Sequence, residues 1–120
     1  MLIGQISTNN ARRVPDKDAI VVDGRTLSWA DVDERARRLA NHLAGAGLGK
    51  GDRVLVIARN TVEWPEIVFA LAKAGFIAVP VNIRLAADEL AYARDDSGAR
   101  GAVIHTDQVE RFGELSLIHI

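Results

Sequence analysis

The hydrophobic and polar positions of the chain fall into short segments with different periods, and each segment predicts an element. Apolar residues spaced through positions 2–13 favour a short helix that ends before Pro15. Positions 19–22 are apolar and mostly β-branched, which is typical of a strand. Positions 23–24 are Asp-Gly, a dipeptide that tolerates the positive φ angles of a two-residue turn, so positions 25–27 are expected to return as the partner strand.

A longer helix is expected to begin at Ser28. The Ser28 hydroxyl and the Asp31 carboxylate have the spacing of a capping box, in which each side chain accepts the backbone N–H of the other residue. The apolar stripe of this helix consists of Trp29, Val32, Ala36, Leu39 and Leu43. The opposite face, which we expect in water, carries Asp33, Glu34, Arg37 and Arg38. Glycines at 45 and 47 are expected to end the helix.

The rest of the chain alternates between strand and helix patterns. Strands are expected over positions 54–58, 76–81 and 102–104, and the first two are apolar enough to be covered on both faces. Helices are expected before Gly75 and over positions 86–96. Alternating strands and helices build parallel sheets with right-handed crossovers. The predicted fold class is therefore α/β, with a β-hairpin followed by a βαβαβ parallel sheet and flanking helices.

Composition narrows the classes of function. The chain has 120 residues, of which 48% are hydrophobic and 26% are charged, as in a folded globular domain. Lys and Arg number 15 against 16 Asp and Glu, and this net charge of −1 argues against nucleic acid or an anionic membrane as the main partner. The absence of cysteine excludes disulfides and cysteine-based sites. No apolar run reaches the ~20 residues of a membrane span, and the first residues lack signal-peptide features, so we expect a cytoplasmic location.

No set of residues in the sequence forms a convincing catalytic or metal site. The glycine-rich segment 45–51 lacks residues that a dinucleotide fingerprint or a P-loop requires, and we expect it to connect a helix to a strand. His105 follows a strand, where α/β sheets place ligands, but it has no second ligand at metal-binding spacing and is expected to be an ordinary loop residue. The acidic pairs at 63/66 and 95/96 are expected to be solvated or to cap helices. Catalytic residues and metal ligands are therefore assigned to none of these positions.

Several stretches of the chain carry motifs in a definite order. Positions 27–34 read LSWADVDE, positions 38–40 read RLA, and positions 71–80 read LAKAGFIAVP. These stretches resemble the start and the LxKAGxxxVP motif of the adenylate-forming (AMP-binding) superfamily of acyl-CoA synthetases, peptide-synthetase adenylation domains and luciferases. The other matching segments are residues 49–54, 60–64 and 95–99. Positions 82–85, Asn-Ile-Arg-Leu, are most similar to acyl-CoA synthetases, also called fatty-acid–CoA ligases.

The resemblance implies a domain organisation and a reaction. Residues 1–114 are expected to form part of the N-terminal subdomain of the large adenylate-forming domain, and residues 115–120 to be a tail unrelated to the family on a truncated chain. The parent enzyme is expected to convert a small carboxylic acid, ATP and coenzyme A to acyl-CoA, AMP and pyrophosphate, with ATP, Mg²⁺ and coenzyme A as its cofactors. The family's nucleotide-binding motifs follow the matched region, so this chain alone is expected to be inactive and to bind none of the three tightly.

The resemblance carries one binding residue onto this sequence. Arg84 of the Asn-Ile-Arg-Leu segment corresponds to an arginine that lies near coenzyme A phosphates in some acyl-CoA synthetases, and the alternative is a solvated loop arginine. Lys73 is expected at the end of its helix, where an ammonium group favours the negative end of the helix dipole. Two other interpretations stay open: a fragment of a peptide-synthetase adenylation domain, and a small α/β binding or interaction module without catalysis.

Overall fold

The computed structural model of the chain describes residues 2–58, 63–82, 84, 86–104 and 118–119. Its helices are α1 (Gly4–Arg13), α2 (Trp29–Gly45), α3 (Glu63–Ala74) and α4 (Ala87–Ser97). Its strands are β1 (Asp18–Val22), β2 (Arg25–Ser28), β3 (Arg53–Ile57), β4 (Ile77–Pro80), β5 (Gly101–Ile104) and β6 (Ile118–His119). The α/β class is confirmed, and the expected helices and strands named above are present with slightly shifted ends.

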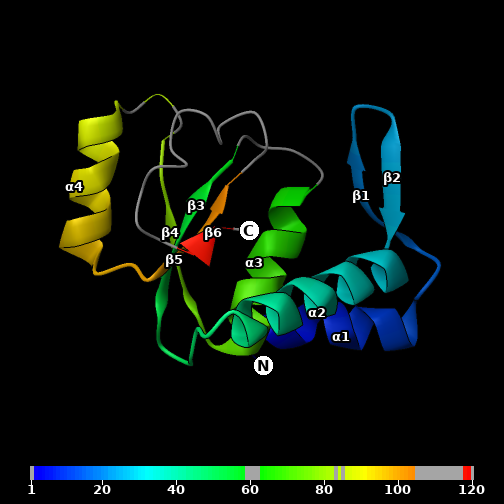
Figure 1. Cartoon of the computed structure of the whole chain (residues 1–120). Coiled ribbons are helices and arrows are strands. Elements are labelled where there is room, and N and C mark those ends of the chain that lie inside the picture. The colour runs from blue at the N-terminus through cyan, green and yellow to red at the C-terminus, as the bar shows by residue number, and fades with distance from the viewer. Residues whose placement is uncertain (1, 59–62, 83, 85, 105–117, 120) are drawn as a thin grey trace.

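The strands form two separate sheets. β1 and β2 pair as an antiparallel hairpin, and the other strands form a parallel sheet in the order β4-β3-β5-β6. In Figure 1, α4 lies on one side of the parallel sheet and α3 and α2 lie on the other. α1 runs beside α2. The hairpin stands apart from the parallel sheet, at the N-terminal end of α2 (Figure 1). The molecule is therefore a three-layer arrangement with a hairpin attached to the helical layer.

Two apolar clusters fill the space between the layers. The cluster under α2 and α3 contains Leu43, Leu48, Val54, Val56, Ile67, Leu71, Phe76 and Val103. The cluster under α4 contains Leu55, Ile57, Leu90, Ala99, Ala102 and Ile104. Successive side chains of β3 point to opposite faces, so this strand contributes to both clusters. The expectation that β3 is covered on both faces is confirmed.

The same expectation for β4 is wrong. β4 lies at the edge of the described sheet, and its Ile77 side chain is 46% exposed. The backbone N–H groups of Ile77 and Val81 bond to carbonyls of the β3 segment, so Ala78 and Pro80 turn their backbone groups outward. A proline has no N–H to donate, and an edge strand is where a sheet tolerates it. The apolar run of this segment therefore indicated burial, whereas Pro80 indicated the edge.

Helix ends follow local chemistry. The Ser28 hydroxyl accepts the Asp31 N–H and the Asp31 carboxylate accepts the Ser28 N–H, both at 3.2 Å, which confirms the capping box of α2. At the start of α4, Ala86 offers no side-chain acceptor, and only the Glu89 carboxylate caps, by accepting the Ala86 N–H at 3.1 Å. Gly98 ends α4 with a φ of 70°, in the left-handed region that favours glycine.

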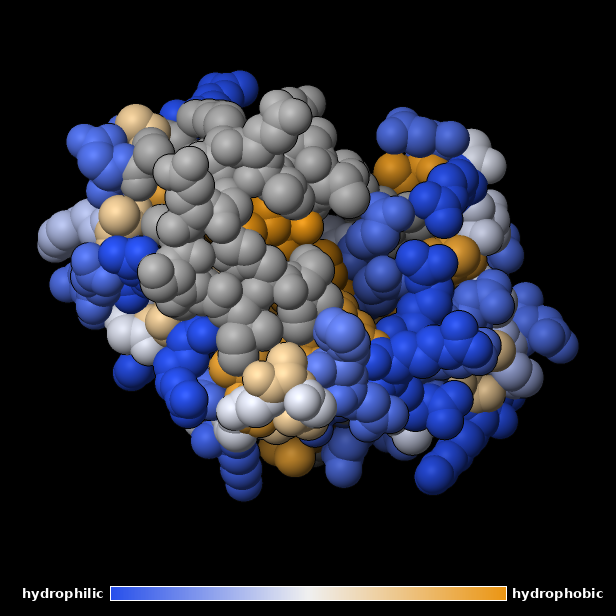
Figure 2. Space-filling view, viewed as in Figure 1, coloured by the Kyte–Doolittle hydropathy of each residue, from blue (hydrophilic) through white to orange (hydrophobic). Residues whose placement is uncertain are grey.

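The surface is mostly polar over the helical layer. Figure 2 shows hydrophilic side chains over α2, and hydrophobic ones come to the surface near the centre of this view. The large exposed apolar residues among those described are Leu2, Ile3, Val14, Val21, Val68, Ile77 and Tyr92, of which Leu2 and Ile3 are adjacent. Among the described residues, no helix combines the length and the apolar character needed to cross a membrane.

Candidate functional site

Arg84 lies in a turn that follows β4. The Asn82 side-chain carbonyl accepts the backbone N–H of Arg84 at 2.9 Å, which holds this turn. Arg84 is exposed, and its guanidinium makes no ion pair with any residue that the structure describes. The turn therefore fixes the backbone and leaves the guanidinium free to meet an anion.

The position of this turn relative to the sheet favours a ligand. The carboxyl ends of β3, β4 and β5 lie at one edge because the three strands are parallel: Val56 pairs with Pro80 and Ile57 pairs with Ile104. Parallel α/β sheets bind ligands outside this edge. Arg84 follows β4, which ends at that edge, so it is a candidate ligand-binding residue there. His105 lies outside the described residues, so its expected loop role stays a prediction.

A second polar constellation joins three helices. We call it the Asp33 cluster: Asp33 on α2, Lys73 on α3, and Ser7 and Thr8 on α1. The Asp33 carboxylate lies 2.9 Å from the Lys73 ammonium and accepts hydrogen bonds from the hydroxyls of Ser7 at 3.0 Å and Thr8 at 3.2 Å. Lys73 also donates to the Thr8 hydroxyl. The side chains of Asp33 and Lys73 are only 8% and 14% exposed, so this is a nearly buried ion pair.

The Asp33 cluster corrects two sequence expectations. The sequence predicts that Asp33 is exposed to solvent together with Glu34, Arg37 and Arg38. The last three are exposed, but Asp33 is buried. Lys73 was expected only to complement a helix end, yet its ammonium is paired across to α2 and α1. The signal that could have found the cluster is the row of small residues Ala36 and Ala40 one and two turns after Asp33, which marks a face where helices pack closely.

The electrostatics of the cluster favour an ionised Asp33. Burial raises the pKa of this carboxyl, but the hydrogen bonds from Lys73, Ser7 and Thr8 and the ammonium charge outweigh burial, so the pKa lies below its ordinary value. The Asp33 carboxylate is contacted by three donors, the Lys73 ammonium and the hydroxyls of Ser7 and Thr8. The Lys73 ammonium in turn contacts Asp33 and Thr8. The arrangement therefore fastens α1 to α2 and α3 and offers no free acid, base or nucleophile.

α1 approaches α3 closely beside this cluster. A side chain at Gly4 would place its Cβ 2.8 Å from the Lys73 nitrogen and 2.9 Å from the Lys73 Cα, both backbone atoms that cannot move aside easily. Gly4 is buried in the contact. The absence of a side chain at this position is therefore what lets Ser7 and Thr8 reach the pair on the neighbouring helices.

A further ion pair links α2 and α3. Arg35 donates from two nitrogens to the carboxylate of Glu66, with the second contact at 3.2 Å, and Glu66 is buried. This pairing raises the pKa of Arg35 through the hydrogen bond to Glu66. The expectation that Glu66 is solvated or caps a helix is wrong for this residue, because it neutralises an arginine between two helices.

The glycine-rich segment 45–51 has a structural role as a connection between elements. The glycine-rich segment leaves α2 and enters β3, as expected, and the Asp52 carboxylate closes it by accepting the Gly49 N–H at 2.7 Å. Within the described ranges, no three His, Asp or Glu side chains come together to hold a metal. No described residue is assigned to Mg²⁺, and the Mg²⁺ requirement expected of the parent enzyme stays a prediction.

Comparison with known proteins identifies the family. Residues 7–118 match the family model described as AMP-binding enzyme. The chain belongs to this family. A fatty acid–[acyl-carrier-protein] ligase of Streptomyces coeruleorubidus is 38% identical over 80% of the chain and 18% of its own length. A feruloyl-CoA synthase of an Amycolatopsis species is 39% identical over 88% of the chain and 21% of its own length. The chain thus spans about a fifth of the curated AMP-binding relatives that it matches.

A solved structure agrees with the fold. The N-terminal domain of FACL13 from Mycobacterium tuberculosis superposes with a TM-score of 0.89 at 27% identity, over 99% of this chain and 33% of that one. The chain therefore has the fold of an N-terminal segment of these enzymes. The boundary expected at residue 115 stays a prediction; the family match runs to residue 118, and the backbone of β6 pairs parallel with β5.

Proposed function

We propose that this chain forms the N-terminal part of an AMP-forming acyl-CoA synthetase. The observation that carries the proposal is the family match over residues 7–118, supported by relatives whose names include an acyl-carrier-protein ligase and a CoA synthase. In the proposed reaction a carboxylate oxygen attacks the α-phosphate of ATP and pyrophosphate leaves. The thiol of coenzyme A then attacks the acyl carbonyl, its proton is released, and AMP leaves as the thioester forms.

Within this reaction we assign Arg84 to a phosphate of coenzyme A. The support is its exposed guanidinium, the turn held by Asn82, and the location at the carboxyl edge of the sheet. A guanidinium presents paired N–H donors that match two phosphate oxygens, which an ammonium cannot do. Losing such a charge-assisted contact costs about 1.5–3 kcal/mol, or roughly tenfold to a hundredfold in affinity.

The test of this assignment separates the two half-reactions in the full-length enzyme. Arg84→Ala is expected to raise the Michaelis constant for coenzyme A, and to leave carboxylate-dependent pyrophosphate release unchanged when no thiol is present. Arg84→Lys is expected to recover part of the loss. The matched control is Arg12→Ala, which removes an exposed arginine from α1, away from this edge of the sheet.

The possible outcomes distinguish the assignment from its alternatives. Equal damage to both half-reactions would make Arg84 a structural residue, and an unchanged constant for coenzyme A would make it a solvated loop arginine. If the full-length protein releases no pyrophosphate with any of a panel of aliphatic and aromatic acids, the proposed reaction itself is wrong.

A second candidate function differs in the thiol that accepts the acyl group. One relative carries the name of a ligase for an acyl-carrier protein, so the thiol of a carrier protein is the alternative to coenzyme A. The same acceptor chemistry applies if the chain belongs to a peptide-synthetase adenylation domain. Offering the adenylated enzyme each thiol separately and measuring thioester formation decides between them.

A further inference from the structure

The link between β4 and α4 is tied to the rest of the chain at both of its ends. On the β4 side, the Val81 N–H donates to the Val56 carbonyl of β3 at 3.0 Å. On the α4 side, the Glu89 carboxylate accepts the Ala86 N–H at 3.1 Å. α4 is itself held against the sheet by Leu90, which is fully buried in the apolar cluster under this helix. Both ends of the link therefore have fixed positions relative to the sheet.

Asn82 makes a hydrogen bond within this link. Its side-chain carbonyl accepts the Arg84 N–H at 2.9 Å, two positions along the chain. In such an Asx turn the asparagine side chain takes the place of a backbone carbonyl and favours one conformation of the turn. Both residues are exposed, so water competes for the Arg84 N–H whenever the asparagine carbonyl moves away. The bond therefore sets how often the Arg84 backbone holds this conformation.

The conformation of the Arg84 backbone decides where its guanidinium reaches. A side chain leaves the chain in a direction that the backbone of its own residue sets, and the stem of Arg84 extends from there. A protein whose binding-competent conformation is only partly populated binds its ligand more weakly by that fraction. A residue that holds the Arg84 backbone therefore strengthens the binding of an anion that this arginine contacts.

We propose that Asn82 is a positioning residue for coenzyme A, which holds the Arg84 backbone and does not itself contact the ligand. Because this role rests on the proposed function, it exists only if Arg84 contacts a phosphate of coenzyme A. An uncharged side chain suits the role. An aspartate would close the same turn, but it would place a carboxylate beside the phosphate and repel it.

Substitutions at Asn82 in the full-length enzyme test this role. Asn82→Ala removes the acceptor and is expected to raise the Michaelis constant for coenzyme A by about twofold to tenfold, the value of one hydrogen bond. Asn82→Ser differs from Asn82→Ala by one hydroxyl, which closes such a turn more weakly, and is expected to recover part of the loss. Pyrophosphate release without thiol is expected to be unchanged in both variants, because coenzyme A takes no part in that half-reaction.

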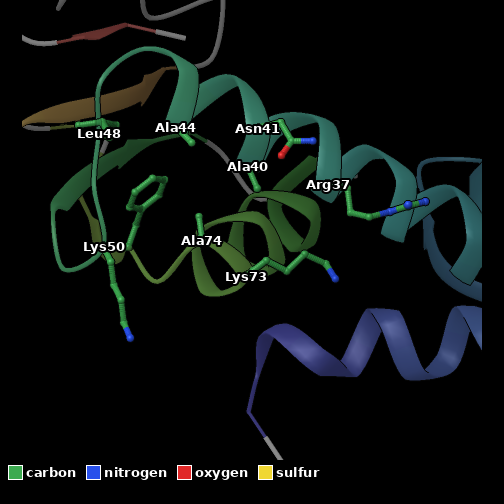
Figure 3. A pocket seen from close by; sticks show the side chains of 9 residues that line it. Arg37, Ala40, Asn41, Ala44, Leu48, Lys50, Lys73 and Ala74 are labelled. Atoms are coloured by element: carbon green, nitrogen blue, oxygen red, sulfur yellow. The ribbon is translucent and has the colours of Figure 1, made fainter.

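A double-mutant cycle shows whether Asn82 acts through Arg84. In an Arg84→Ala background, Asn82→Ala is expected to raise the Michaelis constant for coenzyme A no further, since the guanidinium that it positions is already gone. The matched control is Asn41→Ala, which removes an exposed amide from α2. Figure 3 shows this side chain on α2, and Figure 1 shows α2 and α4 on opposite sides of the sheet. The control is expected to leave the constant unchanged.

The other outcomes overturn the role and separate it from the assignment of Arg84. If Arg84→Ala raises the constant for coenzyme A and Asn82→Ala does not, the phosphate contact stands and Asn82 does not position it. If Arg84→Ala leaves the constant unchanged, the phosphate contact and the positioning role both fail. Equal effects of Asn82→Ala in the two backgrounds would mean that Asn82 acts independently of Arg84. Slower pyrophosphate release in Asn82→Ala would make Asn82 a structural residue.

Discussion

Replacing Lys73 by methionine removes the ammonium from the Asp33 cluster and keeps most of the apolar stem. Asp33 then remains nearly buried with the hydroxyls of Ser7 and Thr8 and with Arg37 at 3.3 Å. Breaking a fully buried ion pair by removing one partner costs about 3–5 kcal/mol, because the other charge stays uncompensated. The donors that remain on Asp33 reduce this cost, so we expect Lys73→Met to lower the free energy of unfolding by about 2–3 kcal/mol.

A double-mutant cycle isolates the interaction. Urea unfolding followed by circular dichroism gives the free energy of unfolding for Lys73→Met, for Asp33→Asn and for the double variant. The double variant is expected to lose less than the sum of the single losses, with a coupling of about 1–2 kcal/mol. The matched control is Arg38→Met, which breaks the exposed pair of Arg38 with Glu34 at 2.7 Å and is expected to cost less than about 0.5 kcal/mol. Additive single losses would refute the argument that the two charges stabilise each other.

The pH dependence gives an independent check on the same pair. The pKa of Asp33 is lowered in the folded chain from its ordinary value of 3.8, so its contribution to stability is present above that value and is lost as pH falls through the lower folded pKa. The difference in stability between the unaltered chain and Lys73→Met should therefore shrink as pH falls below about 4. A difference that stays constant down to the acid transition would mean that Asp33 is not the charge that Lys73 compensates.

Three other perturbations have defined outcomes. Gly4→Ala should lower the melting temperature by an amount equivalent to about 1–3 kcal/mol, because its Cβ meets the Lys73 backbone at 2.8 Å; an unchanged melt would contradict that close approach. The exposed edge strand β4 is expected to make the chain self-associate as its concentration rises, and Ile77→Lys should reduce this association in size-exclusion chromatography because it places a charge on that edge; equal association would point to another surface. The isolated chain should show no carboxylate-dependent ATP–pyrophosphate exchange; exchange that a point substitution abolishes would contradict this.

Local signals in the sequence predicted the elements well. The capping box at Ser28 and Asp31 depends on residues within a few positions of each other, so spacing alone is informative. Arg84, by contrast, became a candidate through the resemblance of positions 82–85 to acyl-CoA synthetases, and its role stays a prediction. Its ligand could not be predicted from physical chemistry alone, because an exposed guanidinium in a turn suits many anions.

The errors arose where a residue's environment depends on distant segments. Asp33 appeared solvated because its neighbours Glu34 and Arg37 are, and only the packing of α1 and α3 onto α2 buries it. Glu66 was misjudged for the same reason, since its partner Arg35 lies on another helix. β4 is a different case. Its apolar residues led to the prediction of a strand covered on both faces, although Pro80, which cannot donate a backbone hydrogen bond, indicated an edge strand.

The fastening of α1 has a consequence for the order in which the chain folds. α1 has 10 residues, fewer than an isolated helix needs to persist in water, so it depends on its contacts. Those contacts are remote in sequence: Ser7 is 26 positions from Asp33, and Thr8 is 65 positions from Lys73. Closing such long loops is entropically costly until α2 and α3 have already paired. α1 should therefore dock last and detach first, and its amides should exchange with solvent faster than those of α2 in the native chain.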